Sequence, residues 1–528
     1  MGPRHRQRPL KDRVQRTRCH GQRITDPAPR LRGPGARFDG WNWSTVGRGE
    51  DQWGRCLRLG LGPGLARRLH IPHILCQSSP MGKLTTTLCL TLAVLVGSAS
   101  LPFATSVADN GEASGYLIKA EQYTVKIRTR VKYPPMGDNK GSFTGAGFLI
   151  DAKRGWIATN AHVSSRNPES LEVAFKDKSF VDAELLYVDR YLDLAVLKVA
   201  PESIPDKSKE AELACQGWPK VGIDVGAYGH PLSLDFSVTT GIISGLRYRH
   251  NRYWIQTDAA INKGNSGGPL IGIRSNRVIG INTATYSKNW SEGIGFAVPM
   301  FYACRVFDLL RVGLDPAPPY LPVAFATGDD IPNELVVAVL YPGLPVSWPL
   351  QPGDKLVSLV KDPDSKFKNQ ADLIHAFRGK SGAVGVRIVR AGKTLNVSLA
   401  SMPRPNLTDW IGLHFSGIVV GREFMRDDKL SNPEGEISIH RVSKASIGSV
   451  SGIRAYRYIV TVDGISFKTV KDLCAYLKRA ESENRRIRLV TRSRSWDYMS
   501  VSKYNLYEVK IDGVKLVGPK VEGPGTCL

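Results

Sequence analysis

The sequence predicts a mainly β protein with several domains. Its length of 528 residues is enough for roughly three or four compact units. Short apolar runs with the alternation of a half-buried strand recur along the chain, for example LDLAVLKV at 192–199. A proline-rich stretch at 315–322, DPAPPYLP, has the composition of a linker. Two later segments, 318–403 and 407–520, share one plan, in which β-rich runs precede a helix and a strand pair follows it.

Residues 1–108 are expected to lie outside the folded domains. The run at 84–96 is apolar, follows Met81 and a lysine, and leads into small residues, which is the pattern of a secretory signal and is short for a bilayer span. Because such a signal starts a protein, we interpret 81–108 as the signal and 1–80 as an extension that is not part of the working protein. An Arg-rich transit peptide and, more weakly, a nucleic-acid-binding tail are the alternatives for the extension.

The composition fits an exported, soluble protein. The formal net charge is +24, of which residues 1–80, with 16 basic and 5 acidic residues, account for +11. The remaining charge of about +13 is most often that of a solvated face, and a basic surface also favours acidic envelope polymers or membranes as partners. We expect a protein exported to the periplasm, or else secreted, with no stable membrane span and no nucleic-acid partner. Outside the doubtful N-terminal segments, four widely spaced cysteines form no metal-binding pattern and allow from zero to two disulfides: Cys215, Cys304, Cys474 and Cys527.

Residues 256–270, QTDAAINKGNSGGPL, form the most informative motif. The glycines around Ser266 let the chain turn sharply and direct the backbone N–H groups of Gly264 and Ser266 into one small hole. A serine hydroxyl attacks a carbonyl well only with a base beside it and with donors where the oxygen becomes charged. Glycine-serine runs also occur in ordinary turns and linkers, but apolar flanks disfavour a linker here. The motif therefore predicts a nucleophile at Ser266.

Two upstream residues supply a candidate base and its orienting acid. His162 follows an apolar strand in WIATNAHV, and Asp193 starts the strand LDLAVLKV. Each residue has an ordinary alternative, since a histidine after a strand is often structural and an aspartate at a strand end is often a cap. The chain order His162, Asp193, Ser266 is nevertheless the order of the chymotrypsin-type triad. The three residues together predict acyl-transfer chemistry that needs no metal and no cofactor.

The region from about Tyr123 to Val312 resembles the protease domain of the HtrA/DegP family. The motifs that carry the resemblance, in chain order, are TGAGFLID at 144–151, TNAHV at 159–163, DLAVLKV at 193–199, TTGIISG at 239–245, QTDAAIN at 256–262, GNSGGPL at 264–270 and GIGFAVP at 293–299. The departures are Lys263, where the family often has proline, and GAYGHP at 226–231. The resemblance implies a chymotrypsin-like double β-barrel protease domain at 112–312.

The resemblance also implies what the protein acts on. It implies an ATP-independent endopeptidase that cleaves unfolded or damaged envelope proteins in protein quality control and stress response, and that assembles as a homo-oligomer, a trimer or larger. The expected substrate contacts are the residues before the nucleophile, Ala260, Ile261 and Asn262, and the strand residues Asn282, Thr283 and Ala284. None of Ala260, Ile261 and Asn262 is acidic, so a preference for Lys or Arg has no carboxylate to support it, and the resemblance implies small aliphatic substrate side chains instead. Two alternatives are a chaperone or peptide-binding scaffold with minor proteolysis, and a secreted processing protease with one defined target.

Both copies of the C-terminal repeat resemble PDZ domains, which bind a peptide C-terminus as an added strand and hold its carboxylate on backbone amides. The helices are expected at 369–377 and 470–477. In the second copy Ile411, Gly412 and Leu413 fit the carboxylate loop, whereas Pro322 in the first copy has no N–H to donate. We therefore expect the second copy to bind peptides more tightly. Generic β-rich packing domains are the alternative.

Overall fold

The fold is described from a computed structural model. The described residues are 112–231, 234–285, 293–326, 334–341, 346–422, 436–493, 503–521 and 527. The expected N-terminal extension and signal peptide at 1–108 lie outside these residues. Among the described residues no helix is long and apolar enough to cross a membrane, and no cluster of side chains is suited to hold a metal ion.

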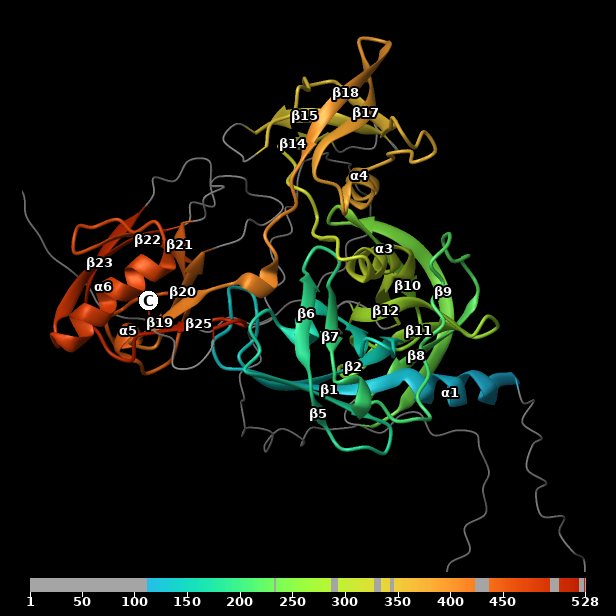
Figure 1. The fold of residues 1–528 in the computed structure, drawn as a ribbon, viewed down its shortest axis with the longest axis horizontal. Helices are drawn as coiled ribbons and strands as arrows, with labels where there is room; N and C mark the ends of the chain where they lie inside the picture. The colour runs from blue at the N-terminus through green and yellow to red at the C-terminus, as the bar shows by residue number, and fades with distance from the viewer. Residues whose placement is uncertain are drawn as a thin grey trace, which may run out of the picture. The chain divides into compact units, whose positions relative to one another are not determined.

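The first half of the predicted protease region is a seven-stranded antiparallel sheet with the strand order β5-β4-β1-β2-β3-β7-β6 (Figure 1). Its elements are α1 (Glu112–Tyr123), β1 (Thr124–Val131), β2 (Gly141–Asp151), β3 (Trp156–Thr159), α2 (Ala161–Ser164), β4 (Ser170–Phe175), β5 (Val181–Asp182), β6 (Glu184–Asp189) and β7 (Leu194–Lys198). Alternate residues of β1, such as Val125 and Ile127, are fully buried. This alternation is the signature of a strand with one face on a core.

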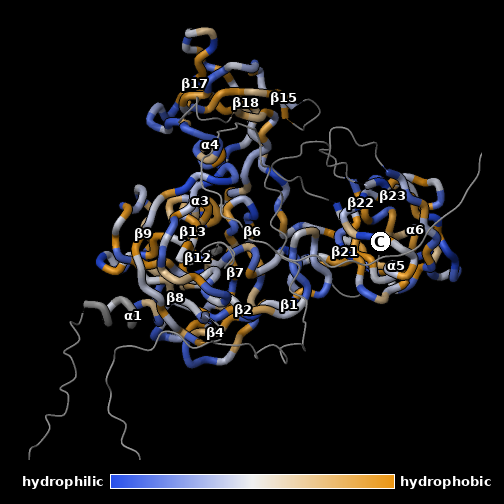
Figure 2. The backbone as a smooth tube through the Cα atoms, turned by 180° about the vertical axis from the view of Figure 1, so that it is seen from behind, coloured by the Kyte–Doolittle hydropathy of each residue, from blue (hydrophilic) through white to orange (hydrophobic). Residues whose placement is uncertain are grey.

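The second half closes into a barrel with the order β10-β13-β12-β11-β8-β9. Its elements are η1 (Pro201–Ser203), β8 (Asp224–Gly229), β9 (Ser237–Arg249), β10 (Arg252–Thr257), β11 (Pro269–Gly272), β12 (Arg277–Thr285), β13 (Gly295–Pro299) and the amphipathic helix α3 (Met300–Arg311). Small and branched side chains such as Val225, Ile243 and Ala297 fill the barrel. Figure 2 shows apolar stretches following many of the strands, while hydrophilic residues lie at many of the loops.

Two further sheets follow in the C-terminal part, and each is accompanied by a helix of at least eight residues. The first has the order β14-β15-β16-β17-β18 and the second β24-β23-β22-β21-β20-β19-β25. The elements are β14 (Val323–Phe325), β15 (Leu335–Leu340), β16 (Lys355–Leu359), α4 (Gln370–Phe377), β17 (Gly382–Arg390), β18 (Lys393–Ser401), η3 (Leu407–Asp409), β19 (Gly412–Phe415), β20 (Ile418–Arg422), β21 (Ile437–Val442), α5 (Ile447–Val450), β22 (Arg457–Val462), α6 (Val470–Ser482), β23 (Arg486–Ser493), β24 (Tyr504–Lys510) and β25 (Lys515–Val517).

Both expected helices are present, and their first residues are set by side-chain caps. Asn369 accepts hydrogen bonds from the N–H groups of Ala371 and Asp372, and Thr469 accepts one from Asp472. These caps satisfy N–H groups that have no partner within the helix. α6 continues to Ser482, beyond the expected end, because its apolar face is extended by a buried Ala480. The assignment of 318–403 and 407–520 as PDZ-like domains stays a prediction.

The four remaining cysteines form two disulfides, a pairing that the sequence left open. Cys215 is joined to Cys304 on α3, with a Cα–Cα distance of 5.6 Å. Cys474 on α6 is joined to Cys527, with a Cα–Cα distance of 5.4 Å. Both disulfides fit the oxidising compartment that export would provide.

Candidate active site

The structure brings two of the three predicted triad residues into direct contact. His162 lies in α2, directly after β3, and Asp193 lies in the turn before β7. His162 Nδ1 is 2.9 Å from Asp193 Oδ2 and 3.1 Å from Oδ1, and the His162 backbone N–H donates to Asp193 Oδ1 at 3.1 Å. With Nδ1 held by the carboxylate, Nε2 is left to act as the base. About half of the His162 side chain, 49 %, is exposed, so a substrate can reach it.

Asp193 is itself held in place by neighbours on two other elements. Thr283 Oγ1, on β12, donates to Asp193 Oδ2, and Asn160 Nδ2 donates to the Asp193 carbonyl oxygen at 2.9 Å. Asp193 adopts a left-handed backbone conformation, with φ of 56°, which aspartate tolerates better than most residues. Burial alone would raise the pKa of Asp193, but the His162 ring and the Thr283 hydrogen bond outweigh it and lower that pKa. The carboxylate is therefore charged at neutral pH.

The same pair changes the proton affinity of His162. Burial favours the neutral imidazole, but the charge of Asp193 and its hydrogen bond outweigh burial and raise the pKa of His162, with a smaller contribution from Asp138. A neighbouring negative charge stabilises the imidazolium in this way. The arrangement thus stabilises the cation that forms when His162 takes a proton.

A pH dependence follows from the raised pKa. A general base works only when it is unprotonated, so kcat/KM should fall on the acid side through an apparent pKa above the ordinary value of 6.5 for histidine. Asp193→Asn should move this acid limb to lower pH, because the charge that raises the pKa is gone. The profile of peptide hydrolysis between about pH 4.5 and pH 9 measures both. An acid limb that stays in place in Asp193→Asn would contradict the pairing.

The turn that carries Ser266 can be built only with glycine at several positions. A Cβ on Gly264 would lie 1.9 Å from the His230 carbonyl oxygen, and one on Gly267 would lie 2.2 Å from both the Ala146 carbonyl oxygen and Thr159 Oγ1. Both glycines also have positive φ, of 108° and 86°. The Ser266 carbonyl accepts from the Ala146 N–H at 2.9 Å, which ties the turn to β2. The sequence pattern is therefore a steric requirement of this turn.

The two N–H groups predicted to form the oxyanion hole have no backbone partner among the described residues. The turn has backbone hydrogen bonds from Asn265 N–H to Asn262 O at 3.0 Å and from Gly268 N–H to Asn265 O at 3.0 Å. Within the described part of the chain, the N–H groups of Gly264 and Ser266 donate to no backbone acceptor. Two unpaired N–H groups on one turn are what a developing oxyanion requires.

The Ser266 hydroxyl is oriented differently from the attacking arrangement. Its Oγ donates to the Thr283 carbonyl oxygen at 3.1 Å, and no hydrogen bond joins it to His162 among the residues described. Side-chain torsions of serine have three staggered wells, so a change of χ1 moves Oγ between partners. Hydrogen bonds of catalytic groups are often loose before substrate binds.

The six expected substrate contacts occupy different environments. Ala260 is exposed and Asn262 is half-buried, whereas Ile261 is packed in the second barrel with 5 % exposed. Asn282 is fully buried, and its Nδ2 donates to the Pro269 carbonyl oxygen at 3.0 Å, so its side chain braces the nucleophile turn. Thr283 is the unpaired residue of a bulge in β12, and the pairing with β13 resumes at Ala284.

The role of Thr283 was missed in the sequence, where it was expected only as a substrate contact. Its hydroxyl orients Asp193, and its carbonyl oxygen holds the Ser266 hydroxyl. A hydroxyl residue directly after the buried Asn282 was the available signal, but a threonine is also an ordinary strand residue. Only the folded chain brings β12 next to the turns that carry Asp193 and Ser266.

Comparisons with known proteins show which class of enzyme the chain resembles. A family model described as a trypsin-like peptidase domain matches residues 145–281, which include all three predicted triad positions. The chain is 35 % identical over 276 residues to a probable periplasmic serine endoprotease DegP-like from Pseudomonas fulva, covering 49 % of this chain and 56 % of that protein. It is 30 % identical over 344 residues to a protein of the same description from Halomonas elongata, covering 60 % of this chain and 70 % of the relative.

The chain belongs to the HtrA/DegP family of serine endoproteases, and its fold is the mainly β, chymotrypsin-like fold of that family. A solved structure described as the HtrA-type protease AlgW with a tripeptide is also similar, at 28 % identity and a TM-score of 0.46, covering 56 % of this chain and 97 % of that one. The match with the Pseudomonas fulva protein spans little more than half of that protein's length, 56 %.

Proposed function

We propose that this chain is an exported serine endopeptidase that degrades unfolded or damaged proteins without ATP. The observation that carries the proposal is the His162–Asp193 pair, at 2.9 Å, together with a serine turn whose two N–H groups are unpaired. Each part has a defined use in acyl transfer. The names of the relatives, which describe periplasmic serine endoproteases, support the same activity and compartment.

The reaction follows from these groups. Ser266 Oγ attacks the substrate carbonyl carbon while His162 Nε2 takes its proton, and the N–H groups of Gly264 and Ser266 bind the oxyanion that forms. His162 then gives the proton to the leaving amine as the C–N bond breaks, which leaves an ester on Ser266. Water, deprotonated by His162, releases the acid and restores the hydroxyl. Asp193 stays ionised throughout, because its partners lower its pKa.

Substrate recognition is proposed to use the main chain more than a charged pocket. β11 begins at Pro269, which pairs with Ile281, and the backbone of Asn282 is bonded to Gly267 and Gly268 of the nucleophile turn. In the described chain β12 therefore has no strand partner on that side beyond Asn282. An extended substrate can add there as a strand. The exposed Ala260 and the absence of an acidic residue among the six expected contacts favour small aliphatic side chains next to the cleaved bond. Main-chain recognition suits substrates that are already unfolded.

Export, assembly and PDZ-type peptide binding complete the proposal. A new N-terminus between about residues 100 and 110, found by terminal sequencing after expression from Met81, would support removal of a signal. A trimer or larger assembly is proposed from the family, and light scattering on purified protein measures it. The two C-terminal sheets are proposed to be PDZ-like domains that bind peptide C-termini.

The breadth of cleavage separates this proposal from its two alternatives. The chain should digest casein and a reduced, unfolded protein at comparable rates, and should leave the native form of that protein intact. If the chain were mainly a chaperone, the wild-type protein and the Ser266→Ala variant would suppress aggregation equally well. Neither casein nor the unfolded protein would then be digested. A processing protease would cut one folded target and spare casein. Either of the last two results would replace the proposed function.

A further inference from the structure

The second C-terminal sheet is extended by β25, the last strand of the described residues. β25 pairs antiparallel with β19, in the register Gly412 with Val517, Leu413 with Leu516 and His414 with Lys515. β20 lies on the other side of β19, so β19 is flanked on both edges. β25 runs toward the start of β19, where the expected carboxylate loop at 411–413 lies. This is the direction in which a peptide ligand would run if it added to β19 with its C-terminus at that loop.

The residues after β25, 518–520, pack closely against the segment that leads into the expected carboxylate loop at 411–413. A Cβ on Gly518 would lie 2.4 Å from the Trp410 carbonyl oxygen, so only glycine allows the two backbones to approach this closely. Lys520 Nζ lies 2.5 Å from Asp409 Oδ1, just before the loop. Gly412 was expected to present free amides to a carboxylate. The structure gives a steric reason for this glycine, because a Cβ there would lie 2.2 Å from the Trp410 ring.

β25 places two consecutive apolar side chains into the domain. Leu516 is 7 % exposed and belongs to the main core of this sheet, together with Leu413 and Leu473. Val517 is 6 % exposed and packs against Trp410 and Val419. Consecutive strand residues face opposite sides of a sheet, and Leu516 and Val517 accordingly pack in two separate apolar clusters. The edge of β19 therefore accepts an extended segment with adjacent aliphatic residues at its C-terminal end.

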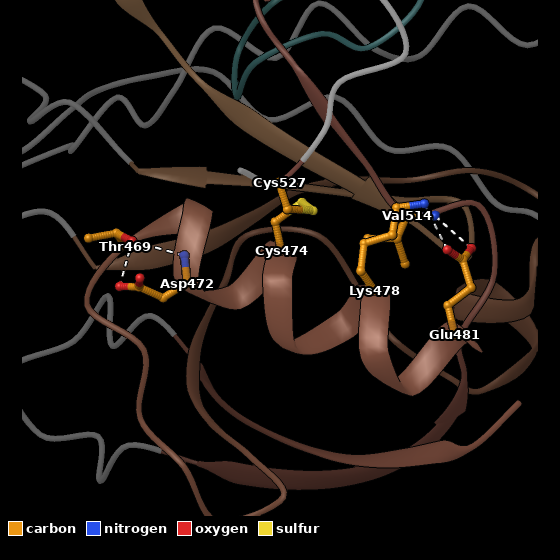
Figure 3. Close-up of a disulfide and its surroundings, with 7 residues drawn as sticks. All are labelled: Thr469, Asp472, Cys474, Lys478, Glu481, Val514 and Cys527. Carbon is orange, nitrogen blue, oxygen red and sulfur yellow. Dashed lines mark hydrogen bonds and ion pairs between the residues drawn. A yellow bond between two sulfur atoms is a disulfide. The ribbon is translucent and has the colours of Figure 1, made fainter. Parts of the chain in front are cut away.

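The segment is fastened to α6 at both ends. Before β25, the Val514 N–H donates to Glu481 Oε1 at 2.9 Å, in the last turn of α6. After β25, Cys527 forms the disulfide with Cys474, nearer the start of α6, as Figure 3 shows. Burial would raise the pKa of Glu481, but the hydrogen bonds from Lys478 and Val514 outweigh it and lower that pKa, so the carboxylate anchor is charged at neutral pH.

The other C-terminal sheet provides a contrast within the same chain. Its strand β14 follows the equivalent loop, which contains Pro322, and pairs only with β15 in the described part of the sheet. From the loop residues alone, the second copy was expected to bind peptides more tightly than the first. In the structure, β25 already occupies the edge of β19 in that second copy. Whether a strand of the chain already covers the binding edge then decides first which sheet can bind a peptide. The residue in the carboxylate loop, proline or glycine, comes second.

We propose that β19 is a peptide-binding edge whose resident ligand is β25 of this chain, Lys515–Val517, which the Cys474–Cys527 disulfide holds in place. In the oxidised protein this edge is closed to other peptides. Reduction by a dithiol transfers two electrons and two protons to the disulfide, which gives the thiols of Cys474 and Cys527 and oxidises the reductant to its disulfide. The freed segment can then exchange with peptides that end in adjacent aliphatic residues.

Peptide binding to the full chain tests this, with Ser266→Ala present in every variant so that nothing is cleaved. The probe is a fluorescent peptide with the sequence of residues 511–517, IDGVKLV, with a free C-terminus, followed by anisotropy. A tethered strand acts at an effective concentration of about millimolar, so it excludes a micromolar probe. A chain that ends at Val514 and carries Cys474→Ser should bind the probe at least ~10-fold more tightly than the oxidised full chain. An amidated probe should bind the shortened chain less well.

Hydrogen exchange of the full chain tests whether β25 is released from β19 when the disulfide is broken. This measurement does not depend on the folding of the shortened chain. Reduction, or Cys474→Ser with Cys527→Ser, should speed exchange in 512–518 and 411–415 at least ~10-fold and leave β21 and β22 unchanged, because only β25 is released. The matched control, Cys215→Ser with Cys304→Ser, removes the other disulfide and should change neither exchange at these segments nor probe binding.

Three results would overturn the proposal. They are a folded shortened chain that does not bind the probe, an oxidised full chain that binds it as tightly as the shortened chain, and unchanged exchange of β25 after reduction. The proposal does not rest on proteolysis, because every binding measurement uses Ser266→Ala. Failure of the protease assignment and failure of this proposal are therefore distinguishable.

Discussion

Ser266→Ala is expected to abolish casein cleavage and leave the fold intact. Removal of a triad nucleophile lowers kcat by roughly 10⁶-fold in well-characterised serine proteases, because no other group can form the acyl-enzyme. The Ser266 hydroxyl makes a hydrogen bond to the Thr283 carbonyl oxygen at 3.1 Å. Its loss should therefore cost no more than about 1 kcal/mol in the free energy of unfolding. Initial rates on labelled casein and a urea titration measure the two effects.

A serine elsewhere in the protease region is the control for this variant. Ser142 is exposed on β2, so Ser142→Ala should keep the wild-type rate and the wild-type unfolding midpoint. Casein cleavage at the wild-type rate by folded Ser266→Ala protein would show that the chemistry lies elsewhere in the chain. A loss of cleavage in both serine variants would point to damage of the fold instead.

Asp193→Asn is expected to lower kcat by about 10⁴-fold while the geometry around His162 is kept. The amide can donate to His162 Nδ1, which favours the tautomer with its proton on Nε2, so only the minor tautomer can accept the Ser266 proton. It also lacks the charge that raises the pKa of His162. kcat should fall far more than KM changes, because Asp193 acts through His162 and makes no proposed substrate contact.

The control for the acid is an exposed aspartate in the same sheet. Asp182 lies on the short edge strand β5, and Asp182→Asn should leave kcat and its pH dependence unchanged. An Asp193→Asn enzyme within ~10-fold of wild type would mean that His162 is oriented by another group. In that case Thr283, which also contacts Asp193, would lose its proposed importance together with it.

The sequence predicted the elements that depend on local chemistry. The apolar run LDLAVLKV at 192–199 forms strand β7, Leu194–Lys198, as its alternation predicted. α4 begins one residue after the expected position because Asn369 is its cap. The glycines around Ser266 were recognised for the same reason, since the turn needs residues without a Cβ. His162 and Asp193 were found from their chain order, and the fold brings them within hydrogen-bonding distance.

Features that depend on contacts between distant segments could not be predicted from the sequence. Thr283 lies 90 residues from Asp193, and nothing near Thr283 shows that its hydroxyl reaches the carboxylate. The cysteines allowed several pairings, and only the positions of α3 and α6 select the two that form. The closing strand β25 has three residues, too few for a periodic pattern, and its partner β19 lies about 100 residues earlier in the chain.

Covalent labelling tests the central claim most directly. A fluorophosphonate reacts with a serine hydroxyl only when a base activates it and an oxyanion hole accepts the developing charge. Mass spectrometry after digestion should find one adduct on the wild-type protein, on the peptide that contains Ser266. The adduct should be absent from Ser266→Ala and strongly reduced in His162→Ala. An adduct at another serine, or none on an enzyme that digests casein, would contradict the assignment of Ser266 as the nucleophile.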